Sequence, residues 1–529
     1  MEQPAVTTQK PINLSHFTKA LIEKLNEIKP KVRHDDTSRI SVSQTVSFFA
    51  IAYEKIRNAV EYRDAHLIRR AAIERILKRR LALNPEAEGE GENLIRELLW
   101  ARYFPNESLG ESDVAAVQRL LDRYLLIKKQ INNQFLFDIL TCSIEETLSP
   151  QEASQNTTFT FFIYQVLKDK VKIEKVSEEE KNAFFYVTLE RWFAKSDNSY
   201  LRYHLFSLFH ESIFEVSDEK IPTLIKQLPQ LFKKVDDLIK NPYSDRMRNF
   251  VKNQFPPFSI LFEIFKKNKD YAKTILQDRN RLWTEVEQIC RLKYAETRSR
   301  LNSLAVKAVV YIFITKMLFA LILEYPLSLW IYGEVSYVSL AINSLFPPLL
   351  MFAIVGLTTI PGEDNTKRLF DRLVGIIDSD RSFESTIAFV ARKAKTRRPL
   401  LIFFFTIFYV LTFFITFNLL HLLLKLLQFN LVSEAIFIFF ISIISFFAYR
   451  IRQVAKEYQV KERESFIRPF VDFFFLPILS VGKFLSQGIA RLNFFTFIFD
   501  FIIEAPFKML FEIVEEWISF IRTKKEEII

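Results

Sequence analysis

Four charged side chains lie inside stretches that are otherwise almost wholly apolar, and they are the residues best placed to do chemistry: Lys316, Glu324, Lys425 and Glu434. A charge at the centre of a hydrocarbon layer costs about 2.5–3.5 kcal/mol, so it has to find a partner, extend to the surface or face water. Lys316 lies half-way along its segment, and the other three lie near one end of theirs. Two acids and a base at one depth predict either a structural ion pair, the favoured interpretation, or the mouth of a permeation path.

No other pattern in the sequence has the spacing of a catalytic or cofactor site. The phosphate-binding patterns GxxxxGK[ST] and GxGxxG, the zinc pattern HExxH and the nucleophile pattern GxSxG do not occur. Cys142 and Cys290 have no histidine beside them that would activate a thiol. The histidines lack the short spacings of metal ligands: His16, His34, His66, His204, His210 and His421. The sequence therefore predicts no enzyme, no metal and no cofactor.

Four segments are long and apolar enough to cross a bilayer, which requires about 20 predominantly apolar residues. They are residues 304–325, 336–359, 400–421 and 431–449. One such segment could be a core helix of a soluble protein, but four of them within one part of the chain argue against that. The sequence predicts an integral membrane protein with four transmembrane helices.

Lysine and arginine are concentrated in the loops on one side of these segments, which by the positive-inside rule is the cytoplasmic side. They precede the first segment, fill the loop between the second and third, and follow the fourth, whereas the opposite loops contain only Lys425. Both chain termini are therefore expected in the cytoplasm, with the plasma (inner) membrane as the expected location. The basic run before the third segment is either a topology signal, which is favoured, or a contact for lipid headgroups: Arg392, Lys393, Lys395, Arg397 and Arg398.

The first 300 residues have the composition of a soluble helical domain. The whole chain contains only 9 Gly but 55 Phe, and a chain so poor in glycine is short of the residue that tight turns and strand bulges require. The fold class expected is all-α. The predicted units are residues 1–300, a cytoplasmic helical domain with a long stalk helix near 258–303; 304–359 and 400–449, two transmembrane hairpins; 360–399, a basic cytoplasmic helical loop; and 450–529, amphipathic helices in the cytoplasm or at the membrane surface.

Residues 493–517 near the carboxyl terminus are apolar, but they carry a polar residue at every fourth position. Thr496, Asp500, Glu504, Lys508 and Glu512 form one stripe on a helix. The opposite face is aromatic, and the interfacial residues expected there are Phe494, Phe495, Phe497, Phe499, Phe501 and Trp517. This pattern predicts a helix that lies in the plane of the headgroups rather than one that crosses. Packing on the helical domain is the alternative.

The function predicted is a membrane-anchored helical scaffold or assembly protein that displays a cytoplasmic interaction platform at the bilayer surface. The expected partners are the lipid bilayer and either another protein or a second copy of the chain. A transporter or channel subunit that uses the charges within the spans is the alternative. A third hypothesis is a lipid-modifying or mechanically responsive protein in which the carboxyl-terminal helices sense bilayer composition. The formal net charge is +10, but the positive and negative residues are almost balanced along the chain. No nucleic acid is expected, because binding one requires a concentrated basic face.

Overall fold

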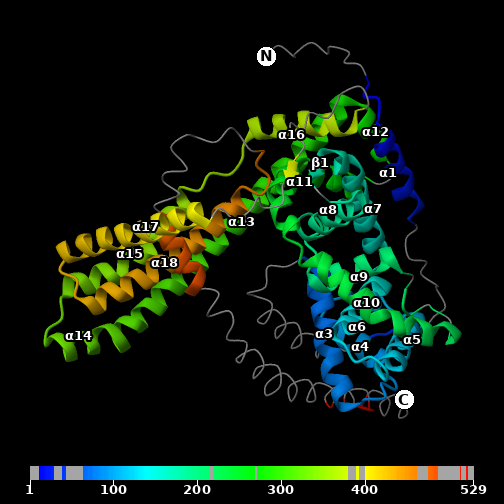
Figure 1. The fold of residues 1–529 in the computed structure, drawn as a ribbon, viewed down its shortest axis with the longest axis horizontal. Helices are drawn as coiled ribbons and strands as arrows, with labels where there is room; N and C mark the ends of the chain where they lie inside the picture. The colour runs from blue at the N-terminus through cyan, green and yellow to red at the C-terminus, as the bar shows by residue number, and fades with distance from the viewer. Residues whose placement is uncertain are drawn as a thin grey trace.

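The computed structural model describes most of the chain: residues 11–28, 39–42, 64–174, 176–210, 212–214, 216, 218–268, 271–378, 389–391, 399–460 and 475–485, with four single positions, 513, 517, 520 and 521. These residues are almost entirely helical, which confirms the all-α fold class. Only two short strands are described, β1 (Val171–Ile173) and β2 (Phe389–Ala391), and they pair in parallel. The molecule consists of a helical body and an elongated bundle of apolar helices that extends away from it (Figure 1).

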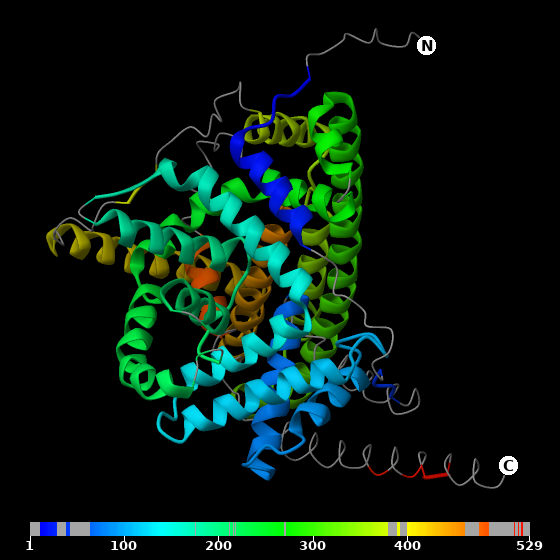
Figure 2. The same cartoon turned by 90° about the vertical axis from the view of Figure 1, so that its right-hand side faces the viewer.

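The helical body contains two hydrophobic cores stacked one above the other (Figures 1 and 2). The first core is formed by α3 (Ala65–Leu83), α4 (Glu90–Trp100), α5 (Glu111–Lys128), α6 (Gln134–Leu148), α9 (Asn198–Phe209) and α10 (Ile221–Ile239), which follows a short 3-10 turn, η2 (Asp218–Lys220). Helix α10 shows why these residues fold in this way. Its buried residues recur at intervals of three or four, so that they line one face: Leu224, Ile225, Leu228, Phe232, Val235 and Ile239.

The second core combines segments from three distant parts of the sequence. It contains α1 (His16–Glu27), α7 (Pro150–Leu167), which continues into the 3-10 turn η1 (Lys168–Lys170), α8 (Glu178–Trp192), α11 (Pro242–Lys267), α12 (Ala272–Gln277), the start of α13 and all of α16 (Glu363–Ile377). Val460, which follows the last long apolar helix, is also buried in it. The body therefore extends beyond residue 300 and includes α16, which belongs to the loop between the second and third apolar segments.

Helix α13 (Arg279–Phe319) connects the body to the bundle without a break. It begins where the Asp278 side chain accepts hydrogen bonds from the backbone N–H groups of Asn280 and Arg281, which satisfies two of the free donors at a helix start. At 1.5 Å per residue, its 41 residues extend about 60 Å. The predicted stalk near 258–303 is thus the second half of α11, then α12, then the first half of α13.

The described part of the chain contains four helices that are long and apolar enough to cross a membrane. The first is the apolar end of α13, continued by a π turn, η4 (Ala320–Glu324), and α14 (Tyr325–Tyr332). The others are α15 (Tyr337–Gly356), α17 (Pro399–Leu426) and α18 (Leu431–Ala455). Gly333, at φ +71°, ends α14 in the left-handed conformation that glycine adopts most easily. The two short turns that follow α14 and α17 lie at the end of the bundle farthest from the body (Figure 1).

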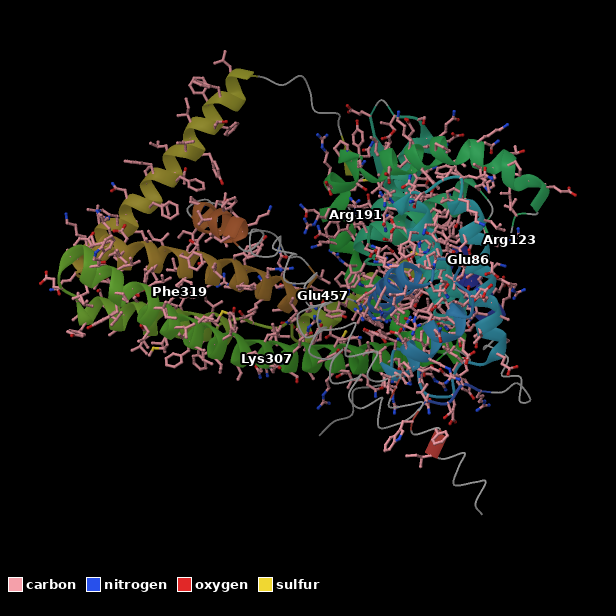
Figure 3. All side chains as sticks on the ribbon, turned by 90° about the horizontal axis from the view of Figure 1, so that it is seen from below. Glu86, Arg123, Arg191, Lys307, Phe319 and Glu457 are labelled. Atoms are coloured by element: carbon pink, nitrogen blue, oxygen red, sulfur yellow. The ribbon has the colours of Figure 1, made fainter. Side chains whose placement is uncertain are left out.

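Helices α13, α15 and α18 pack against one another around Leu301, Ile312, Met351, Phe440 and Ile444. Helix α17 joins this group near the far end of the bundle, where Leu424 packs with Phe429 and Phe437, and its other end diverges from the group (Figure 3). A short apolar helix, Phe475–Leu485, contacts both α17 and α18. We call it the wedge helix.

Several predicted residues lie outside the part of the chain that the structure describes. They include the basic run Arg392, Lys393, Lys395, Arg397 and Arg398, and the aromatic residues Phe494, Phe495, Phe497, Phe499 and Phe501. Trp517 is described, and its side chain is 63% exposed. The placement of residues 493–517 at a membrane surface therefore stays a prediction.

Candidate functional site

Lys316 and Glu324 form an ion pair inside the apolar bundle. The Lys316 Nζ lies 3.2 Å from the Glu324 Oε2, and the two side chains are 0% and 1% exposed. In a regular α-helix, residues eight apart differ in direction by about 80°, so they do not share a face. The π turn Ala320–Glu324 lies between the two, and it accommodates one extra residue, so eight residues complete about two turns. Pro326, two residues after the turn, lacks the N–H that a regular α-helix would use.

Asn343 on α15 completes the cluster and connects it to a third helix. Its Nδ2 donates to the Glu324 Oε1 over 2.6 Å and to the backbone carbonyl of Ser433 on α18 over 3.1 Å. The Phe440 ring lies 4.8 Å from the Lys316 Nζ, close enough for a cation–π interaction. The Asn343 Oδ1 has no hydrogen-bond partner among the described residues. We call Lys316, Glu324 and Asn343 the buried charge cluster, and it joins α13, α15 and α18 at one level of the bundle.

Two further polar contacts lie near the far end of the bundle. The Asn430 Nδ2 donates to the Ser328 Oγ over 3.1 Å, which connects α14 to the turn before α18. The His421 Nδ1 lies 2.7 Å from the Glu434 Oε2, which connects α17 to α18. Every helix of the bundle therefore has at least one polar contact with another helix or with the turn before α18.

In the structure, the four charged residues predicted from the sequence do not form a single group. Glu324 pairs with Lys316, and Glu434 pairs with His421. Lys425 is exposed, and no ion pair joins it to either acid in the described part of the chain. The sequence did not indicate His421 as a partner, because it is thirteen residues from Glu434 and the turn between their helices decides whether the two meet.

The members of the buried charge cluster compensate one another's charges. A buried charge is stable only when an opposite charge and further hydrogen bonds compensate for its loss of water, and Glu324 has both, from Lys316 and Asn343. The cluster contains no thiol or hydroxyl nucleophile. Among the described residues, no group of three or more His, Cys, Asp and Glu is arranged to bind a metal ion. The contacts of the cluster connect three helices of the bundle.

A second buried polar network lies in the body and centres on His204 of α9. The His204 Nδ1 is 3.0 Å from the Glu190 Oε2 on α8, and its Nε2 is 3.0 Å from the Glu146 Oε1 on α6. Burial lowers the pKa of His204, but the two carboxylates outweigh it and raise the pKa to about 10. Glu190 also accepts from the Ser196 hydroxyl over 2.7 Å. We therefore expect His204, a half-buried side chain, to carry a positive charge, and it connects three helices.

A small cavity adjoins this network, with residues of α3, α6, α7, α8 and α9 in its walls. Its free volume is about 30 Å³, and roughly 10–15 Å³ of such space is enough to hold one water molecule. The surrounding carboxylates already have partners, since Glu145 accepts from Arg69 and from the Tyr200 hydroxyl. The cavity suits a water molecule rather than a substrate.

No protein family, no curated protein and no solved structure matches this chain. Any functional conclusion therefore rests on its own residues and their geometry.

Proposed function

We propose that this protein is a membrane-anchored helical scaffold, in which four transmembrane helices hold a helical interaction platform at the bilayer surface. The observation that carries the proposal is the way in which the bundle joins the body. Three separate segments at the near end of the bundle pack into the second core of the body: the start of α13, helix α16 and residues 456–460. A flexible tether would need only one connection, whereas three fix the body relative to the bundle.

Asn365 on α16 joins these three segments directly. Its Nδ2 donates to the Tyr294 hydroxyl on α13 and to the backbone carbonyl of Tyr458, both over 2.8 Å. Its Oδ1 accepts from the Val460 N–H over 2.8 Å. An asparagine that is 6% exposed and uses both ends of its amide in this way makes the junction rigid.

The distribution of charge at the junction agrees with a membrane boundary at this level. The Lys195 Nζ on the body lies 3.5 Å from the Glu457 Oε1, just past the end of α18. Figure 3 shows Glu457 at the edge of the body and Lys307 on the part of α13 that lies beyond the body, in the bundle. Beyond Lys307 the exposed side chains of α13 are apolar, among them Val310, Tyr311 and Ile314. We propose that the headgroups lie near Lys307, that the body and both termini lie on the cytoplasmic side, and that the membrane is the plasma (inner) membrane.

A transporter or channel subunit is the second candidate, and one observation favours it. The buried charge cluster combines a π turn with the Asn343 Oδ1, which has no partner among the described residues, and π turns occur often at functional sites. The side chains of Lys316 and Glu324 are only 0% and 1% exposed to solvent. Because a permeation path would expose them to water, their burial favours the scaffold.

One pair of experiments on the full chain separates the two candidates. Cross-linking in intact membranes with an amine-reactive reagent is expected to join the exposed lysines of α10, Lys226, Lys233 and Lys234, to one protein in a fixed ratio, either a partner or a second copy. In proteoliposomes, ion flux is expected to equal that of protein-free vesicles, and Lys316→Ala is expected not to change it. Flux that disappears in Lys316→Ala, together with no stoichiometric adduct, would establish the transporter instead.

A further inference from the structure

The wedge helix is seated against α18 at a point where only glycine fits. A Cβ built on Gly482 would lie 2.0 Å from the backbone oxygen of Ser442, 2.7 Å from its carbonyl carbon and 2.9 Å from the Cβ of Phe446. Because two of these atoms belong to the backbone, no side-chain movement could relieve the overlap. Close approach of two backbones through a small residue is a common way for helices to pack within a membrane. The chain has only 9 Gly in 529 residues, and one of them lies here.

The other side of the wedge helix contacts α17. The Ser480 hydroxyl lies 2.9 Å from the Tyr409 hydroxyl. The wedge helix therefore fills the angle between the diverging end of α17 and the rest of the bundle (Figure 3).

The contacts of the wedge helix lie deep in the apolar layer. Along α18, Ser442 is about 16 Å from Leu431 at the far end and about 12 Å from Arg450 at the near end, at 1.5 Å per residue. Along α17, Tyr409 is about 15 Å from Pro399. Both contacts thus fall near the middle of a layer that is about 30 Å thick. Residues that lay in the headgroup plane would meet α18 near Arg450 instead.

The described part of the wedge helix, Phe475–Leu485, extends about 16 Å, which is about half the thickness of this layer. The chain starts from the side of the body, because Val460 is buried in the second core. Its exposed residues include Phe484 and Phe475, which are 77% and 51% exposed, and Lys483, whose charge has to reach a partner, the surface or water.

We propose that Phe475–Leu485 is a half-helix that inserts into the hydrocarbon layer from the side of the body, seats Gly482 on α18 and Ser480 on α17, and presents Phe484 to lipid acyl chains near mid-depth. The proposal rests on the membrane anchoring proposed above. It gives the divergence of α17 a physical cause, since the half-helix occupies the space that α17 would otherwise close. A helix lying in the headgroup plane would contact neither Ser442 nor Tyr409, so these two contacts distinguish the proposed placement from that one.

Depth-dependent quenching of a single fluorophore tests the half-helix. The full chain carrying Phe484→Cys is labelled with an environment-sensitive dye and placed in vesicles whose lipids carry a spin label either at mid-chain or at the headgroup. Cys142 and Cys290 are buried, so the parent chain serves as the labelling blank. The mid-chain quencher is expected to reduce the fluorescence more than the headgroup quencher does. A label at Phe408→Cys, an exposed position of α17 beside Tyr409, is the depth reference.

A matched pair of glycine variants tests the seat on α18. Gly482→Ala in the labelled chain is expected to reverse the quenching order, because the added Cβ displaces the wedge helix from Ser442. Gly356→Ala in α15 is expected to leave the order unchanged, because no atom of the described residues lies within 4 Å of its Cβ position.

The possible outcomes have distinct meanings. In one outcome, the headgroup quencher reduces the fluorescence at residue 484 more than the mid-chain quencher does, while the reference at residue 408 is quenched mainly from mid-chain. This result would overturn the half-helix and leave the anchoring intact. Absence of mid-chain quenching at both positions would overturn the anchoring and the half-helix together. An unchanged order in Gly482→Ala would overturn the seat on α18.

Discussion

Replacing Lys316 by methionine is expected to destabilise the apolar bundle by about 3–5 kcal/mol, the usual cost of removing one partner of a buried ion pair. Methionine fills a similar volume, so the loss comes from the Glu324 carboxylate that stays buried at 1% exposure without its cation. Glu324→Gln is expected to destabilise by a similar amount, since it leaves the Lys316 ammonium without its anion. Unfolding of the full chain by SDS in mixed micelles, followed by circular dichroism, measures the effect.

The double variant Lys316→Met, Glu324→Gln distinguishes a lost charge pair from lost packing. It removes both charges and keeps an amide at position 324 within reach of Asn343, so its stability is expected to exceed that of either single variant. Lys307→Met is the control for the loss of one cation on the same helix, because Lys307 is exposed. A Lys316→Met variant as stable as Lys307→Met would contradict the account of the buried charge cluster.

Glu190→Gln is expected to destabilise the helical body by about 3 kcal/mol, because it removes the buried carboxylate that pairs with the His204 cation. Glu190 is 1% exposed, so water cannot take over this role. Glu179→Gln, in the exposed first turn of the same helix, is the control, and its effect is expected to be within about 0.5 kcal/mol. The thermal unfolding midpoint of the full chain in detergent measures both. Equal midpoints for the two variants would refute the role of Glu190.

The same network predicts the direction of a pH dependence. The pKa of His204 is raised from 6.5 to about 10 in the folded body, so the folded chain keeps a proton that the unfolded chain releases above pH 6.5. The stabilisation is complete below pH 6.5 and is lost as the pH rises toward 10, by about 1.4 kcal/mol per pH unit. Between pH 7 and 8.5 the free energy of unfolding is expected to fall by about 2 kcal/mol. Glu190→Gln is expected to make this slope shallower.

The apolar architecture could be predicted from the sequence because the length of an apolar segment directly reflects the thickness of a bilayer. The second and fourth predicted segments, 336–359 and 431–449, start within one residue of α15 and α18. The first and third helices extend further than their segments, because α13 begins in the body and α17 continues past residue 421 as far as Leu426. Hydropathy identifies the part of a helix that is apolar, and its capping residues decide where the helix ends.

The pairing within the buried charge cluster could not be predicted in the same way. Lys316 and Glu324 were both identified as charges that need a partner, but their spacing of eight residues puts them on different faces of a regular helix. Only the π turn brings the two residues onto one face of the helix, and no periodicity in the sequence predicts this turn. Asn343 is a neutral residue in an apolar helix and gives no signal at all. The network around His204 is equally hidden, because Glu146 and Glu190 lie on two other helices.

The junction between the body and the bundle also depends on contacts across long stretches of sequence. The amphipathic spacing of residues 363–377 predicts a helix, but not the core into which Leu369, Phe370 and Leu373 pack. Asn365 contacts Tyr294 and Tyr458, which are more than seventy residues away on either side. Contacts of this kind appear only once the helices have been assembled.

The sidedness of the bundle is the central claim, and single-cysteine labelling on sealed vesicles tests it most directly. Lys425→Cys places a thiol at an exposed position near the far end of the bundle, and Lys226→Cys places one on the exposed face of α10 in the body. A membrane-impermeant maleimide is expected to label one of these cysteines in right-side-out vesicles and the other in inverted vesicles, with Lys226→Cys on the cytoplasmic side. Labelling of both cysteines from the same side would contradict the account.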